Sequence, residues 1–92
     1  MKRDPAYSEF IRSQPCCACC RPPRSEQHHC TGAGMALRSD DRDSMPLCTQ
    51  CHRDFHAAAG QFRGWVKRRR RWWQGSMANK FQRLYRDKQE AW

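Results

Sequence analysis

The stretch PLCTQCHRDFH, residues 46–56, combines two cysteines and two histidines at fixed spacings. Two residues separate Cys48 from Cys51, so one short turn can present two thiolates to a single tetrahedral metal ion. His52 and His56 are four residues apart and would share one face of a helix, where both can bind a second ion. The stretch therefore predicts a metal-bound knuckle that leads directly into a helix.

Another cysteine knuckle, CCACC at residues 16–20, precedes this one, with 28 residues between Cys19 and Cys48. In chain order it is the first knuckle, and the one at residues 48–51 is the second. The spacing of the first knuckle allows Cys16 with Cys19 or Cys17 with Cys20, and the proline before Cys16 favours the first pair. Closing so long a loop on one ion would supply folding free energy to a short chain. The expected ligands of a structural Zn²⁺ are Cys16, Cys19, Cys48 and Cys51.

The composition favours a metal over disulfides as the stabilising device. Only 38% of the 92 residues are hydrophobic and the mean hydropathy is -1.09, so the core must be thin. Seven cysteines are an odd number, and the N-terminus shows no apolar signal sequence. With no stretch of about 20 apolar residues either, we expect a cytoplasmic protein with reduced thiols and no membrane contact.

The positive charge is concentrated in the last third of the chain. Residues 63–92 carry ten Lys and Arg against two acids, a net +8, whereas residues 1–62 carry eight against seven, a net +1. This difference predicts a zinc-stabilised domain at 1–62 and a basic helical extension at 63–92. Charge beside aromatic rings suits nucleic acid, although the tryptophans could instead cover the zinc core. The candidate DNA-binding residues are Lys67, Arg68, Arg69, Arg70, Arg71, Trp72 and Trp73.

The local patterns predict short helices and strands around these motifs. Asp4-Pro5 should start a helix at Ala6–Ser13, and Gly60 should end the helix after the second knuckle. Gly75 should break the basic region into two helices. The expected elements are a helix at 6–13, a strand at 25–31, a helix at 51–59, a helix at 61–73 and a last helix carrying Met77, Phe81, Leu84 and Tyr85 on one face.

Together the motifs resemble the HNH (ββα-metal) endonuclease superfamily. The match runs from Pro15 to His56, under half of the chain, and includes the His28-His29 pair between the knuckles. Within the superfamily, the Gly34-Met35 pair, a following aspartate and Pro46-Leu47 before the second knuckle look most like the phage recombination-enhancement, RecA-dependent nucleases. The resemblance implies a small α+β fold with a treble-clef, ββα-metal core and flanking helices.

The resemblance also implies roles for individual residues. His29 would be the general base that takes a proton from the attacking water. A divalent ion, Mg²⁺, Mn²⁺ or Zn²⁺, would bind the scissile phosphate and stabilise the leaving 3′ oxygen. Its ligands would be His28, His52 and His56.

Two features depart from the HNH pattern. The central asparagine is missing, and either Asp41 or Asp43 would take its place in orienting His29 or supporting a ligand. Adjacent residues of a strand face opposite sides, so His28 and His29 could share a site only through a bulge or a twisted edge. The roles of these two histidines could therefore be exchanged.

The leading hypothesis is a metal-dependent DNA endonuclease that acts in phage recombination or DNA processing. One alternative is a zinc-dependent DNA-binding module without catalysis. Another is an adaptor that docks on a host recombination protein such as RecA through its helical tail. One tight zinc per chain would favour the binding module, and a second, weaker ion would favour the nuclease.

Overall fold

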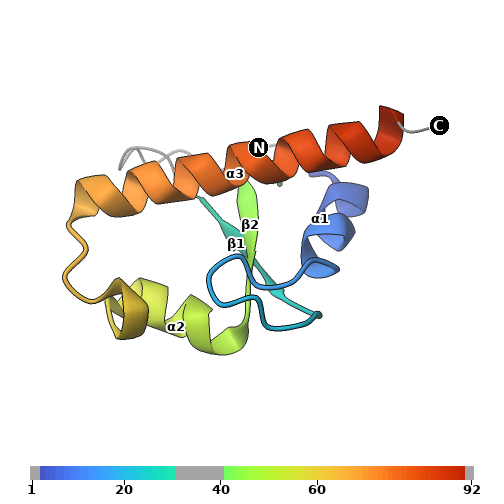
Figure 1. Ribbon diagram of the computed structural model, residues 1–92. Helices are drawn as coiled ribbons and strands as arrows, with labels where there is room; N and C mark the ends of the chain where they lie inside the picture. Colours follow the sequence, from blue (N-terminus) through green and yellow to red (C-terminus); the bar gives the residue numbers. More distant parts are fainter. Residues whose placement is uncertain (1–2, 31–40, 91–92) are drawn as a thin grey trace.

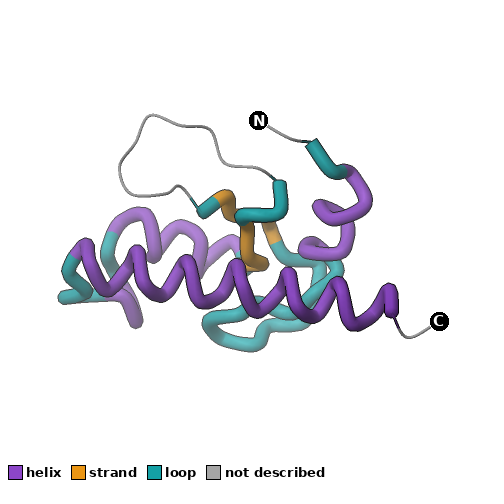
Figure 2. The backbone as a smooth tube through the Cα atoms, turned by 90° about the horizontal axis from the view of Figure 1, so that it is seen from above, coloured by secondary structure: helices purple, strands orange, loops and turns teal. Residues whose placement is uncertain are grey.

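The structure is a computed structural model that describes residues 3–30 and 41–90. It is a small α+β fold in which a two-stranded antiparallel sheet lies between helices. The long helix α3 crosses one side of the molecule, with α2 beneath its first half and α1 beneath its second half (Figure 1). Seen from above, the strand pair lies near the middle (Figure 2). The Gly34-Met35 pair lies outside the described residues.

The first helix, α1, spans Pro5–Arg12, one residue earlier at each end than predicted. The Asp4 side chain accepts a hydrogen bond of 3.1 Å from the backbone N–H of Tyr7, which confirms the predicted cap. Tyr7, Phe10 and Ile11 are buried along one face, because their spacing places them on the same side of the helix. This face anchors the N-terminal segment on the rest of the fold.

The sheet pairs β1, Glu26–His29, with β2, Ser44–Leu47. Four consecutive pairs run from Glu26 opposite Leu47 to His29 opposite Ser44. β1 therefore has no bulge of the kind that would let His28 and His29 share a site, and its side chains alternate normally. His28 is buried and His29 is exposed, so the two histidines face opposite sides of the sheet.

The helix α2 spans Thr49–Ala57 and begins directly on the second knuckle. Cys48 is its N-cap, because its Sγ accepts a hydrogen bond from the N–H of Cys51. The prediction that Gly60 ends this helix is wrong. Ala58 takes the left-handed cap conformation with φ of 53°, and Gly60 starts a 3-10 turn, η1, at Gly60–Phe62.

The basic region forms one helix, α3, over Lys67–Glu90, and not the two helices predicted. An internal glycine costs only about 1 kcal/mol relative to alanine. That cost is offset because residues on both sides of Gly75 pack on the core, with Gln74, Ala78 and Phe81 all buried. Tertiary packing therefore carries the helix through a local break signal.

Two clusters of buried side chains form the core, and α3 contributes to both. Ala78 joins the cluster around Phe55, Phe62 and the knuckles, and Phe81 joins the cluster of α1. Residues on both sides of the expected boundary at 62/63 thus share one core. Of the predicted apolar stripe, Leu84 is an exception, with 42% of its surface exposed. No helix within the described ranges is long and apolar enough to span a bilayer.

Candidate metal centre and nucleic-acid interface

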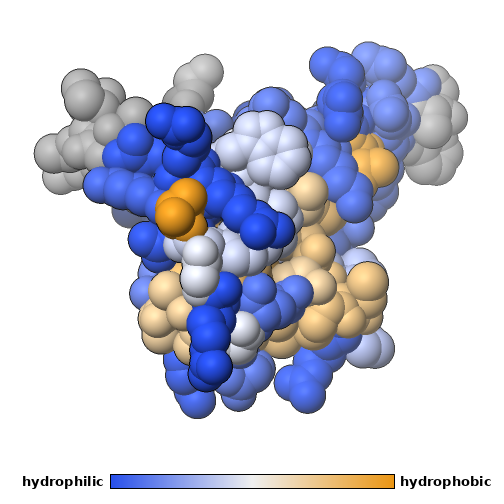
Figure 3. All heavy atoms as spheres, turned by 60° about the vertical axis from the view of Figure 1, so that its left-hand side comes forward, coloured by the Kyte–Doolittle hydropathy of each residue, from blue (hydrophilic) through white to orange (hydrophobic). Residues whose placement is uncertain are grey.

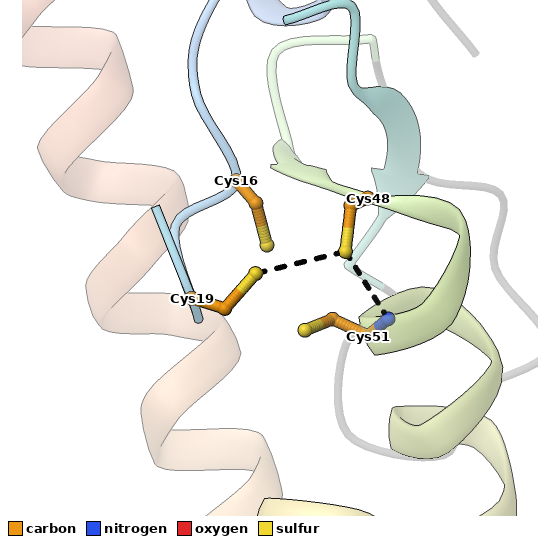
Figure 4. A group of neighbouring side chains, drawn as sticks. All are labelled: Cys16, Cys19, Cys48 and Cys51. Atoms are coloured by element: carbon orange, nitrogen blue, oxygen red, sulfur yellow. Dashed lines mark hydrogen bonds between the residues drawn. The ribbon is translucent and has the colours of Figure 1, made fainter. Parts of the chain in front are cut away.

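Four cysteines from distant parts of the chain meet at one point. Their sulfur atoms lie within 4.8 Å of one another, and Figure 4 shows them directed toward a common centre. The first knuckle is held to the sheet by the N–H of Cys17, which donates to the carbonyl of Pro46 at 3.0 Å. The group, Cys16, Cys19, Cys48 and Cys51, is the predicted one, and it can hold a metal ion.

The two other cysteines of the first knuckle lie outside this group. Burial raises the pKa of the Cys17 thiol to about 12, so it stays protonated and packs against both apolar clusters. Cys20 is exposed and takes a left-handed backbone conformation with φ of 66°. The structure therefore selects Cys16 with Cys19 over Cys17 with Cys20.

Three of the four histidines form a second group, which we call the histidine cluster: His28, His52 and His56. Each offers a ring nitrogen, and these atoms lie within 4.8 Å of one another. His52 and His56 extend from α2 one turn apart, and His28 reaches them from β1. Nδ1 of His28 lies 3.2 Å from Nε2 of His52. Because Cys51 immediately precedes His52, the cysteine group fixes where α2 presents its histidines.

Two acceptors on the outer side of the cluster determine how its rings are protonated. Oε1 of Gln74, on α3, lies 2.8 Å from Nε2 of His28. Oε1 of Glu26 lies 2.8 Å from Nδ1 of His52. Each acceptor places the ring proton on the nitrogen that faces it. In neutral rings, the two nitrogens 3.2 Å apart then both carry lone pairs, a repulsive contact that a shared cation would relieve.

The buried position of His28 keeps its imidazole neutral. Burial lowers its pKa to about 4, an effect that the Gln74 hydrogen bond opposes. Burial also lowers the pKa of His56, and the positive charges of His52 and Arg70 act in the same direction. Neutral imidazole is the form that binds metals.

His29 lies outside the histidine cluster and has a partner of its own. Its Nε2 is 3.0 Å from Oδ1 of Asp41, whose other oxygen accepts a hydrogen bond from the N–H of Asp4. The hydrogen bonds from Asp4 and His29 lower the pKa of Asp41. The other candidate, Asp43, lies 3.5 Å from Nε2 of Gln82. Of the two aspartates, Asp41 is the one that contacts His29.

The basic aromatic run separates into two faces of α3. Trp72 is 69% exposed, whereas Trp73 packs on Phe55 and Phe62 with ring centroids 5.5 and 5.4 Å apart. Trp73 therefore covers the core, one of the two roles that the sequence allows for the tryptophans, whereas Trp72 faces solvent. The guanidinium of Arg69 lies over Trp65, 4.1 Å from the ring centre.

Sequence reasoning missed two residues of the histidine cluster's surroundings. Glu26 lies two residues before His28 on β1, and the two-residue period of a strand could have placed both on one face. Gln74 had no comparable signal, because 46 residues separate it from His28. Its role depends on how α3 docks.

Comparison with known families assigns the chain to one of them. The family described as "Protein of unknown function (DUF968)" matches residues 2–80. The chain belongs to this family. The match includes both knuckles, the four histidines and the first half of α3.

A curated relative is similar to part of the chain. The "Uncharacterized protein YdfU" of Escherichia coli (strain K12) is 36% identical over 53 residues. The aligned segment covers 54% of this chain and 15% of the relative, so the chain spans a small part of that protein's length. No solved structure matches significantly.

Proposed function

We propose that this protein is a metal-dependent endonuclease of the HNH type that hydrolyses phosphodiester bonds of DNA. The observation that carries the proposal is the histidine cluster, three ring nitrogens within 4.8 Å beside a basic helix. Lys67, Arg70 and Arg71 line a cavity that includes His28 and His56. Metal ligands next to cations suit a phosphate substrate.

The cysteine group would hold a structural Zn²⁺. Four thiolates form a closed tetrahedral donor set, which suits zinc and leaves no position for a substrate. Two of the ligands, Cys48 and Cys51, lie at the start of α2, the helix that carries His52 and His56. The cysteine group therefore has a positioning role, because it orients the helix that presents the histidines.

The donor chemistry of the histidine cluster fits a divalent ion with open coordination positions. Gln74 and Glu26 direct the free lone pairs of His28 and His52 toward each other, as the hydrogen-bond acceptors behind metal-bound histidines do. A divalent ion bound there would supply Lewis-acid stabilisation of negative charge on a phosphate. The protein's own contribution is to hold the rings in one protonation state before the ion arrives.

His29 would act as the general base. Its hydrogen bond to Asp41 puts the ring proton on Nε2 and leaves Nδ1 free to accept a proton from water. Asp41 would thereby serve in place of the asparagine that this chain lacks. The His29 side chain is 42% exposed, so water can reach it.

The second candidate function is a DNA-binding module without catalysis. His29 faces the opposite side of the sheet from His28, and this observation favours the second candidate. A module of this kind would use the exposed Arg68 and Trp72 and need only the zinc. Action in phage recombination beside a recombinase such as RecA remains a prediction from the resemblance.

A nicking assay separates these functions. Supercoiled and single-stranded DNA would be incubated with the zinc-loaded protein and added Mg²⁺ or Mn²⁺. We expect wild type to cut and His29→Ala to lose at least 10²-fold in rate, the range that a general base supplies. Gln89→Ala, an exposed change near the end of α3, is the control for handling and folding. Absence of cutting by wild type with either ion would leave the binding module as the function.

A further inference from the structure

A cavity of about 210 Å³ opens between the histidine cluster and the start of α3. One wall comes from the cluster and α2, and the other comes from the first two turns of α3. Figure 3 shows this end of the molecule, where hydrophilic side chains lie beside less polar and hydrophobic ones. The lining residues are His28, Phe55, His56, Lys67, Arg70, Arg71 and Gln74.

The three cations of this cavity have no counter-charge among the described residues. None of the ion pairs of those residues includes Lys67, Arg70 or Arg71. Arg70 is the most buried of the three, and its Nε is fully buried without a hydrogen-bond partner in residues 3–30 and 41–90. Because Nε has no accessible surface, an anion that enters the cavity would contact the other guanidinium nitrogens of Arg70, which lines the cavity.

The position of Arg70 on α3 links it to the histidine cluster. Gln74 is one helical turn further along and points to the same side, where it contacts His28. The Arg70 side chain therefore extends toward the cavity beside His56. A planar guanidinium binds phosphate through two parallel hydrogen bonds and fixes its orientation.

We propose that Arg70 is a phosphate-binding residue of the active site, which holds a backbone phosphate of DNA against the histidine cluster, with Lys67 and Arg71 as flanking charges. This inference rests on the proposed nuclease function and deepens it. It assigns the basic run a role inside the site, in addition to any contact that its exposed residues make with DNA. The ligand class is a phosphodiester, for which inorganic phosphate is the simplest probe.

Inorganic phosphate is the probe, titrated by calorimetry into the zinc-loaded 92-residue chain at low salt. We expect one bound phosphate for wild type and binding at least tenfold weaker for Arg70→Gln. Arg83→Gln is the matched control, since it removes the same charge from an exposed site on the same helix. Its affinity should stay within about twofold of wild type. Arg70→Lys keeps the charge without the planar fork and should bind with intermediate affinity.

Circular dichroism and zinc content verify that each variant is folded. If Arg70→Gln fails to fold, the Arg70→Lys variant still tests the assignment, because unchanged phosphate affinity would contradict it. Equal losses in Arg70→Gln and Arg83→Gln would overturn the proposal, as would no phosphate binding by wild type. If wild type binds phosphate through Arg70 and does not cut DNA, the nuclease function fails and the anion site stands. If it cuts DNA and phosphate affinity is insensitive to Arg70, only the present inference fails.

Discussion

Gln74 on α3 and His28 on β1 are joined by a 2.8 Å hydrogen bond between two buried side chains. The bond ties the basic helix to the sheet at the histidine cluster. It also fixes which nitrogen of His28 is free, because the amide oxygen can only accept. The helix that carries most of the net positive charge is thus part of the candidate metal site.

Replacing Gln74 by leucine should weaken metal binding at the histidine cluster by about 10- to 100-fold, the usual effect of losing the acceptor that orients a metal-binding histidine. The cysteine group does not contact Gln74 and should keep its zinc. Zinc stoichiometry under a graded chelator measures both sites, with a tight and a weaker ion expected for wild type. Gln89→Leu, an exposed change on the same helix, is the control. Equal retention of the weaker ion in both variants would show that Gln74 does not support the site.

Loss of the cysteine group should unfold the protein. Cys51→Ser removes one of four buried or converging thiols, and zinc binding supplies much of the folding free energy of so small a domain. Circular dichroism should show a loss of helical signal in this variant. Strong chelators should cause the same loss in the wild-type protein. Cys20→Ser changes an exposed thiol outside the group and should melt like wild type. A native spectrum for Cys51→Ser would exclude the structural role.

The continuity of α3 gives a stability test with opposite signs at two glycines. Gly75 is exposed within the helix, and an added Cβ would meet nothing within 4 Å. Gly75→Ala should therefore stabilise the fold by about 1 kcal/mol. Gly64 also has open space, but its φ of +80° is unfavourable for alanine, so Gly64→Ala should destabilise. Urea denaturation measures both, and a loss of stability in Gly75→Ala would indicate a helix break at this residue.

The sequence predicted those features that depend on neighbours along the chain. The spacing of Cys48 and Cys51 and of His52 and His56 determines where the donors lie once a turn and a helix form. The meeting of the two cysteine knuckles was predicted as well, since one metal needs four ligands.

What the sequence could not predict depends on packing between distant segments. Taken alone, Gly75 signals a helix break. The break does not occur because residues of α3 such as Phe81 are buried against α1. The partner of His29 could not be decided between Asp41 and Asp43 by counting residues, because the two-residue offset is settled by how the chain turns into β2. The docking of α3 likewise determines that Gln74 reaches His28.

The two aspartates should differ in their effect on DNA cleavage if the proposed function is right. Asp41→Ala removes the acceptor of the His29 ring proton. The cleavage rate should therefore fall by about 10²-fold, the lower end of what a general base supplies. Asp43→Ala removes a 3.5 Å contact to Gln82 and should cause a smaller loss. Rates at saturating metal, with melting curves for both variants, make the comparison. A larger loss in Asp43→Ala would transfer the orienting role to that residue.

Trp72 and Trp73 are adjacent rings with different surroundings, so their substitutions should have different effects. Trp73 contacts Phe55 and Phe62 in the core, so Trp73→Ala should destabilise the fold by about 3–5 kcal/mol. Trp72 is exposed, and Trp72→Ala should leave stability within about 0.5 kcal/mol. If its ring stacks on a base, the variant should lose about 1–3 kcal/mol of affinity for single-stranded DNA.

The charge next to Trp72 is tested by the salt dependence of the same binding reaction. Arg68 is exposed on α3, and Arg68→Gln should reduce the slope of log affinity against log salt by about 0.7–0.9 if it contacts one phosphate. A truncation after Gly64 cannot replace this test, because it would also remove Trp73 and Phe81 from the core. Unchanged affinity in Trp72→Ala, together with an unchanged salt slope in Arg68→Gln, would mean that the outer face of α3 does not contact DNA. DNA contact would then be confined to the cavity beside the histidine cluster.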